Sequence, residues 1–224
     1  MSLGSFDPSF DTLPATLPIF PLPGALLLPG GKLPLQIFEP RYLAMIRDAL
    51  ASDRLIGMIQ PLGQQSEKEG LVSHTAELYP VGCAGRITAY SETDNGRYLI
   101  TLTGVCRFAI QKELPTVGGY RRVVPEFARF RSDMDTAATA NVDRQRLLKA
   151  LQAYFNHQKI SIDPGTVMDI PDDKLVTSLA MVCPFDAKEK QALLEASDLG
   201  ERSRVMTALL ELGAFAGQDD SLRH

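Results

Sequence analysis

The chain has 224 residues, of which 45% are hydrophobic and 22% are charged, and its formal net charge is −4. This composition is typical of a globular protein that buries a core without disulfides or structural metals. The sequence contains no apolar stretch of about eighteen residues, so no membrane span is predicted. It also has no basic start followed by an apolar stretch, so no secretory signal is predicted. Residues 1–130 carry 12 basic and 12 acidic side chains and residues 131–224 carry 11 and 15, so neither part has the basic excess of a nucleic-acid-binding protein.

Residues 1–130 have the pattern of a β-rich module. Eight of the 15 prolines lie in the first 40 residues, which favours extended or turning chain. Apolar and other residues alternate over 33–38, as in a strand, and Pro40 then opens a helix with apolar positions three to four apart. Further strands are predicted at residues 55–60, 78–90, 97–111 and 121–130, with Asn95-Gly96 as a hairpin turn. Many short strands with one helix predict a small curled sheet or pseudo-barrel.

Residues 131–224 have helical periodicity and are predicted to form a second module. One helix is expected over 141–158, and Pro171 precedes a second that ends before Pro184. Asp186 and Glu189 have the spacing of a capping box for a third helix at 188–196, and a fourth follows residue 198. The predicted fold class is therefore α+β, a β pseudo-barrel followed by a C-terminal helical bundle. Self-association through surplus apolar positions of these helices is left open.

The three cysteines, Cys83, Cys106 and Cys183, are far apart and form no CxxC motif. An odd number of dispersed cysteines argues against a disulfide framework and for a reducing compartment, so we expect a cytoplasmic protein. Free cysteine is among the most frequently buried residue types, and we interpret all three as small core residues.

Motifs for catalysis or cofactor binding are missing from the sequence. Gly30-Gly31-Lys32 lacks the preceding glycine and the following Ser or Thr of a phosphate-binding loop. There is no HExxH or GxSxG motif, and the isolated histidines His74, His157 and His224 have no carboxylate at ligand spacing. We therefore expect no enzyme activity, no cofactor and no metal. A catalytic dyad built around His74 or Cys83 only in the folded chain stays open as an alternative.

The main basic concentration lies near the end of the β-rich module, at Arg121, Arg122, Arg129 and Arg131. If residues 121–130 form a strand, Arg121 and Arg129 share one face and Arg122 lies on the other. The interpretation as a solvated strand rim is favoured. The alternative is a contact for an anionic ligand such as RNA phosphate, with Arg121, Arg122 and Arg129 as candidates.

The first 40 residues combine many prolines with large apolar side chains and little charge. Much of this run must be core, but a curled sheet with limited helical cover can leave an apolar groove or edge open. Such a surface could take an extended hydrophobic peptide by strand addition or groove packing. The candidate peptide-binding residues are Leu26, Leu27, Leu28, Phe38 and Tyr42.

The same region contains three distinctive runs: Leu17-Pro18-Ile19-Phe20-Pro21-Leu22, Leu28-Pro29-Gly30, and the run from Leu33 to Tyr42 that contains Phe-Glu-Pro-Arg-Tyr. The resemblance of these runs is to the start of the Lon protease N-terminal domain. It continues in Val81-Gly82-Cys83-Ala84-Gly85-Arg86-Ile87 and Leu102-Thr103-Gly104-Val105-Cys106-Arg107-Phe108 and covers about residues 14–215 by the order of the motifs.

This resemblance implies a PUA-like pseudo-barrel followed by a helical bundle, in a region that helps a protease to select substrates. The ATPase and Ser–Lys peptidase modules of the full protease are absent from the sequence, so we expect a stand-alone, non-catalytic member of the family. The implied partners are unfolded or hydrophobic polypeptides and a protease or chaperone. Glu39 and Arg41 are interpreted as architectural residues at the strand-to-helix corner. RNA binding, by analogy with other PUA-like folds, is the alternative.

Overall fold

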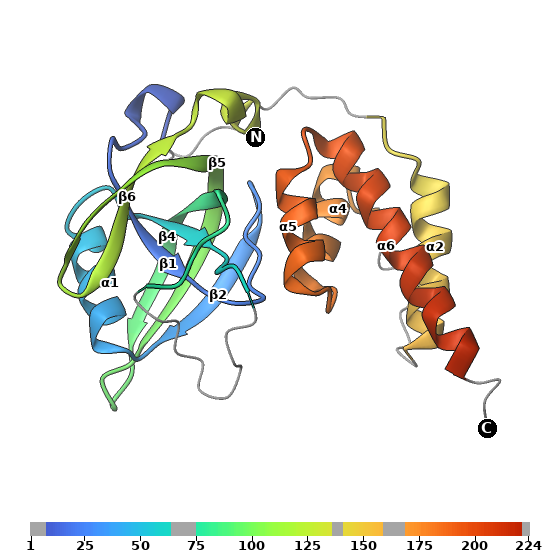
Figure 1. The fold of residues 1–224 in the computed structure, drawn as a ribbon, viewed down its shortest axis with the longest axis horizontal. Helices are drawn as coiled ribbons and strands as arrows, with labels where there is room; N and C mark the ends of the chain where they lie inside the picture. The colour runs from blue at the N-terminus through green and yellow to red at the C-terminus, as the bar shows by residue number, and fades with distance from the viewer. Residues whose placement is uncertain (1–7, 64–74, 136–140, 159–168, 221–224) are drawn as a thin grey trace. The chain divides into compact units, whose positions relative to one another are not determined.

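The computed structural model describes residues 8–63, 75–135, 141–158 and 169–220 of the chain. These residues form two compact units, residues 1–138 and 139–224, which we call the β unit and the helical unit. Figure 1 shows the strands gathered in the first and the long helices in the second. The predicted α+β class is confirmed by this content.

The β unit consists of six strands, one α-helix and two short 3₁₀ helices within its described part. In chain order these are η1 (Phe10–Thr12), β1 (Leu17–Pro21), β2 (Lys32–Ile37), α1 (Pro40–Leu50), β3 (Leu55–Ile59), β4 (Val81–Glu92), β5 (Tyr98–Val117), β6 (Tyr120–Glu126) and η2 (Ala128–Met134). The sequence pattern predicted a strand through residue 130. The strand instead ends at Glu126, and the chain turns into η2, which brings Phe130 into the core.

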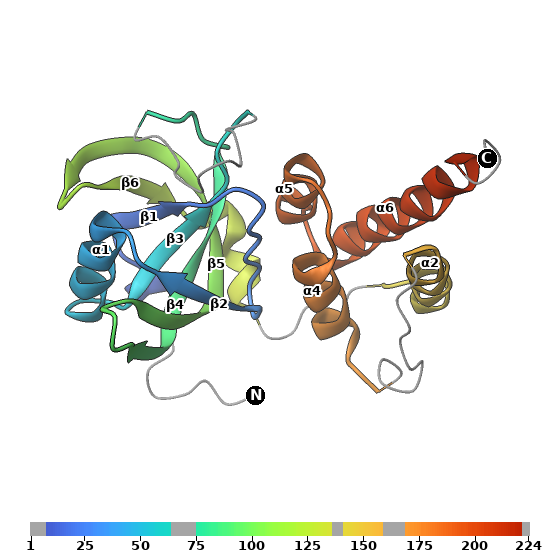
Figure 2. The ribbon, with the colours of Figure 1, turned by 90° about the horizontal axis from the view of Figure 1, so that it is seen from below.

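Five of the strands close into a barrel-like ring. β1 pairs with β3 in parallel and with β6 in antiparallel fashion, and Figure 2 shows β1 between these two strands. β3 pairs with β4, β4 with β5, and the second half of β5 with β6, which completes the ring. β2 lies outside the ring and pairs only with the first half of the 20-residue strand β5.

The ring is filled by large apolar side chains that meet the backbone of small residues. Phe108 is fully buried, and its phenyl group occupies the space that a side chain at position 82 would need. A Cβ atom added to Gly82 would lie 2.7 Å from the Phe108 Cζ atom. The approach at Gly104 is closer still, because an ideal Cβ there would lie 2.0 Å from the carbonyl oxygen of Leu28. Only glycine permits this contact between β5 and the segment before β2.

Helix α1 follows from its sequence pattern. Pro40 occupies the first turn, and Tyr42, Met45, Ile46 and Ala49 are buried along one stripe. The helix packs against β1 and β6 (Figure 1). A hydrogen bond of 2.8 Å from the Tyr120 hydroxyl to Asp48 Oδ2 ties the exposed side of α1 to β6.

The helical unit is a bundle in which the long helix α6 packs against the other three described helices. The helices are α2 (Arg144–His157), α4 (Asp172–Val182), α5 (Ala187–Glu195) and α6 (Leu199–Asp220). The predicted capping box is present, since Asp186 accepts from the Glu189 N–H while Glu189 accepts from the Asp186 N–H. Arg202 of α6 donates to the Leu193 carbonyl near the end of α5.

Candidate functional site

The five residues proposed from the sequence to bind peptide occupy different environments. Leu26, Leu27, Leu28 and Tyr42 are buried in the β unit, whereas Phe38 is 58% exposed. The leucines are buried because the segment between β1 and β2 packs against β4 at Gly85 and against β5 at Gly104. The structure therefore places only Phe38 of this set on the surface.

Tyr42 belongs to the packed corner between β2 and α1. Its ring centroid lies 4.2 Å from that of Phe20, and the Arg41 guanidinium lies 4.5 Å from its centre. Burial raises the pKa of Tyr42 to about 12. Arg41 in turn donates through Nε to Glu39 Oε2 at 2.8 Å. This ion pair spans the start of α1, in agreement with an architectural role for both charged residues.

The candidate anion-binding arginines are each engaged by the protein itself. Arg121 is buried and donates to both carboxylate oxygens of Glu113 and, at 2.7 Å, to the carbonyl of Ala76. Arg122 donates to the Pro115 carbonyl at 3.3 Å, although its Nε has no hydrogen-bond partner in the described part of the chain.

Arg129 and Arg131 both lie on η2, where their guanidinium groups contact aromatic rings. The guanidinium of Arg129 is 4.7 Å from the centre of the Phe130 ring and 3.6 Å from a Glu126 oxygen. Arg131 lies 4.4 Å from the centre of the Phe10 ring. These contacts stabilise the local structure around η2.

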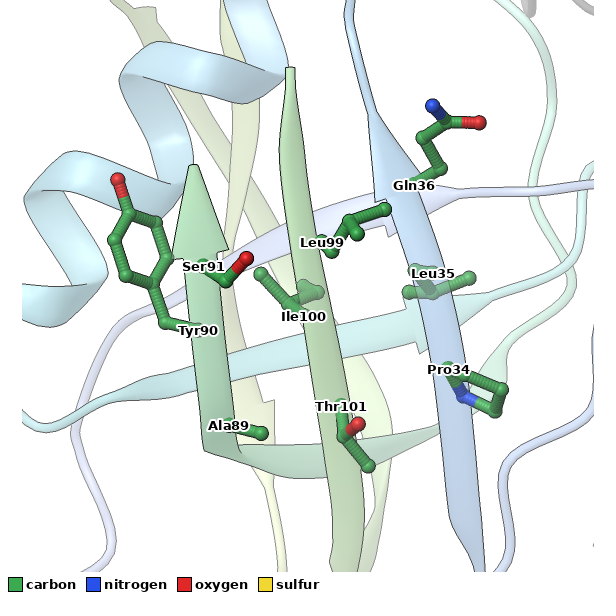
Figure 3. A pocket seen from close by; sticks show the side chains of 9 residues that line it. All are labelled: Pro34, Leu35, Gln36, Ala89, Tyr90, Ser91, Leu99, Ile100 and Thr101. Carbon is green, nitrogen blue, oxygen red and sulfur yellow. The ribbon is translucent and has the colours of Figure 1, made fainter. Parts of the chain in front are cut away.

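A surface pocket of about 460 Å³ lies on the sheet formed by β2, β5 and β4. Figure 3 shows the central strand β5 flanked on one side by β2 and on the other by β4. We use the name β2–β5–β4 face for the side of this sheet that carries Pro34, Gln36, Leu99, Thr101 and Ser91, which the pairing register places side by side.

The β2–β5–β4 face is apolar at its centre. Leu99 is 45% exposed, while its neighbours on the same strand, Tyr98 and Ile100, are buried on the opposite side. Phe38 continues the alternation of β2 and lies beside the Arg97 guanidinium, 5.8 Å from the ring centre. Exposed leucine, proline and phenylalanine side chains are thus gathered where solvent reaches them, which is typical of interaction surfaces.

The charges on this face are basic. Lys32 at the start of β2 and Arg97 just before β5 are exposed, and within the described residues neither forms an ion pair. No Asp or Glu occurs at the β2 or β5 positions of this face. An apolar surface flanked by unpaired cations suits a ligand that is apolar and carries negative charge.

The groups that could support catalysis are buried or dispersed. Cys83, Cys106 and Cys183 are free and buried, and burial raises the pKa of the Cys106 thiol to about 12 and of the Cys183 thiol to about 11. Across the described ranges, no group of three or more His, Cys, Asp or Glu side chains could hold a metal ion. His157 is exposed, and His74 lies outside the described residues.

Sequence reasoning missed Leu99 and Pro34 as surface residues. The signal was available, because Leu33, Leu35 and Ile37 alternate with Pro34, Gln36 and Phe38 and only one set can face the core. Without the pairing of β2 with β5, however, the neighbour that completes the face could not be identified.

Comparison with known proteins gives a family match over residues 16–211, to the ATP-dependent protease La (LON) substrate-binding domain. Lon protease 2 of Myxococcus xanthus is 27% identical over 208 residues, covering 89% of this chain and 24% of the relative. Lon protease of Anaeromyxobacter dehalogenans is 28% identical over 210 residues, with 89% and 23% covered. The chain thus spans about a quarter of the length of these relatives. No helix in the described part is long and apolar enough to cross a membrane.

Solved structures share the fold. The Lon N-terminal domain protein from Xanthomonas campestris superposes with a TM-score of 0.59 at 20% identity, covering 86% of this chain and 97% of that one. The N-terminal domain of Mycobacterium avium complex Lon protease gives a TM-score of 0.53 at 16% identity, covering 87% and 97%. Only the substrate-binding domain is matched, and no catalytic domain. The chain therefore belongs to the Lon substrate-binding domain family and has the fold of its substrate-recognition module.

Proposed function

We propose that the β2–β5–β4 face binds hydrophobic segments of unfolded polypeptides. The observation that carries this proposal is the exposure of Leu99, which lines the pocket, and of Phe38 on the same sheet face of a substrate-recognition module. A ligand can bury only the exposed 45% of Leu99, which contributes about 0.7–1.4 kcal/mol, or roughly threefold to tenfold in affinity. An aspartate at this position would in addition have to lose water of hydration on binding an apolar ligand.

The test is binding of fluorescently labelled apolar peptides, measured by polarisation, to Leu99→Asp and to a matched variant. Val117→Asp is the control, because Val117 lies on the same strand with nearly the same exposure, 43% against 45%, but away from the pocket. We expect Leu99→Asp to weaken binding at least tenfold and Val117→Asp to leave it unchanged. Equal affinities of the two variants and the unmodified chain would refute the role of this face.

We further propose that the bound segments are presented to a protease or chaperone partner in the cytoplasm. The family match supports a link to proteolysis, and three free, buried cysteines fit a reducing compartment. A pull-down from lysate with protease subunits blocked tests this step: partners should be retained by the unmodified chain and by Val117→Asp. RNA binding is not proposed, since the candidate arginines contact groups of their own chain.

A further inference from the structure

Strand β2 is an edge strand with one free side. Its only strand neighbour among the described residues is β5. The Gly104 N–H donates to the Gly31 carbonyl at 2.9 Å, which sets the alternation of hydrogen-bonded pairs along this ladder. Leu33, Leu35 and Ile37 therefore direct their backbone groups to β5, and Lys32, Pro34 and Gln36 direct theirs away from the sheet.

The proline on β2 agrees with this assignment. Pro34 has no N–H, and a proline within a sheet is tolerated where that group would point away from the ladder. The free edge then offers the N–H groups of Lys32 and Gln36 and the carbonyls of Lys32, Pro34 and Gln36. No backbone hydrogen bond to these groups from another described segment is present. Two donors and three acceptors in a row can pair with one extended polypeptide.

The side chains beside this edge indicate which side chains the bound polypeptide would have. On the β2–β5–β4 face, β2 presents Lys32, Pro34 and Gln36 in this order, and Phe38 follows directly after the strand. The Arg97 guanidinium lies 5.8 Å from the centre of the Phe38 ring. Phe38 lies six residue steps after Lys32, so the two ends lie about 20 Å apart in an extended strand. An added strand has the same period of two, and its side chains on this face would meet each of these residues in turn.

We propose that the free edge of β2 binds an extended segment of the substrate polypeptide as an added strand, with acidic residues at the Lys32 and Arg97 ends and apolar residues between them. The recognised pattern is acidic–x–apolar–x–apolar–x–acidic. This inference rests on the proposed function and specifies its ligand: main-chain pairing along β2 requires an unfolded segment, and the lack of carboxylates at the β2 and β5 positions of this face favours acidic residues in the ligand.

The decisive experiment uses one peptide of this pattern and two N-methylated forms of it, with the full chain. Methylation of alternate residues removes either the N–H groups that face β2 or those that face solvent. We expect one N-methylated form to bind at least tenfold more weakly and the other to bind like the parent peptide. Equal affinity of both forms overturns strand addition and leaves groove packing on the face intact. Failure of every apolar peptide to bind refutes the proposed function together with this inference.

Three protein variants test the same edge through changes in the protein instead of the peptide. Gln36→Pro removes an outward N–H without removing a bond to β5, and Gln36→Ala is its control because the N–H is kept. We expect Gln36→Pro to bind threefold to tenfold more weakly than Gln36→Ala, and equal affinities contradict strand addition. Lys32→Glu should weaken binding of the acidic peptide and strengthen binding of a peptide with lysine at that end. If Gln36→Pro does not fold, the N-methylated peptides with the unmodified chain decide.

Discussion

Removing the carboxylate of Asp133 should destabilise the β unit by about 3–5 kcal/mol, because it leaves a buried guanidinium without its counter-ion. The side chains of Arg107 and Asp133 are only 3% and 7% exposed. Asp133 Oδ2 accepts from the backbone N–H of Arg107 at 2.9 Å and from its Nε at 2.8 Å, and Oδ1 accepts from Nη2 at 2.7 Å. These three bonds hold η2 against β5, and the ring centre of Phe130 on η2 lies 4.8 Å from the Arg107 guanidinium.

The measurement is urea denaturation of Asp133→Ala. Unfolding is followed by hydrogen exchange in peptides from β5, so that the midpoint reports on the β unit alone. With a slope of about 2 kcal/mol per molar urea, a loss of about 4 kcal/mol lowers the midpoint by about 2 M. The control is Glu126→Ala, which breaks the exposed pair with Arg129 at 3.6 Å and should cost at most about 1 kcal/mol.

A double variant separates ion-pair removal from loss of packing. Arg107→Met with Asp133→Leu replaces both charges by apolar side chains and should recover part of the stability lost in Asp133→Ala. Recovery is incomplete because the backbone N–H of Arg107 still lacks the acceptor that Asp133 Oδ2 provides. If Asp133→Ala lowers the midpoint no more than Glu126→Ala does, the buried pair does not stabilise the packing of η2 on β5.

Three further predictions concern the core of the β unit. Gly104→Ala should lower the melting temperature by several degrees, as measured by differential scanning calorimetry, since its Cβ would lie 2.0 Å from the Leu28 carbonyl oxygen. The Cys106 thiol, whose pKa burial raises to about 12, should resist alkylation at pH 8 in the folded chain and react once urea unfolds it; fast labelling of the native chain would contradict its burial. Burial raises the pKa of Tyr42 and of Tyr120 from 10.0 to about 12, so the unfolded chain loses these protons first and stability should fall as the pH rises from 10 to 12. Phenylalanine at either position should flatten that fall in urea titrations, and an unchanged pH dependence would show that these tyrosines do not cause it.

Much of the fold was predictable because local patterns determine local structure. The alternation over residues 33–38 predicts β2, Pro40 and the apolar stripe after it predict α1, and the Asp186–Glu189 spacing predicts the start of α5; the structure confirms all three. The motif that contains Gly104 and Arg107 could be recognised from the sequence. Only the structure shows why these residue types are needed: Gly104 allows a close backbone contact with Leu28, and Arg107 forms a buried ion pair with Asp133.

The candidate site was less predictable because exposure depends on partners that are distant in sequence. A run such as Leu26–Leu28 has the same composition whether it lies in a groove or in the core, and here the approach of β5 at Gly104 buries it. Arg121 and Arg122 are adjacent in the chain, yet one is buried against Glu113 while the other bonds to Pro115. A count of basic residues contains no information about such partners.

The sequence alone was enough to predict a β-rich part, a helical part, most of the strands and helices, and the family resemblance. These features depend on residues a few positions apart in the chain. The closure of the ring and the docking of β2 on β5 decided which side of each strand meets solvent, which arginines are paired and that Leu99 lies opposite Gln36. The reason is that pairing between distant strands brings together residues whose separation along the chain carries no local signal.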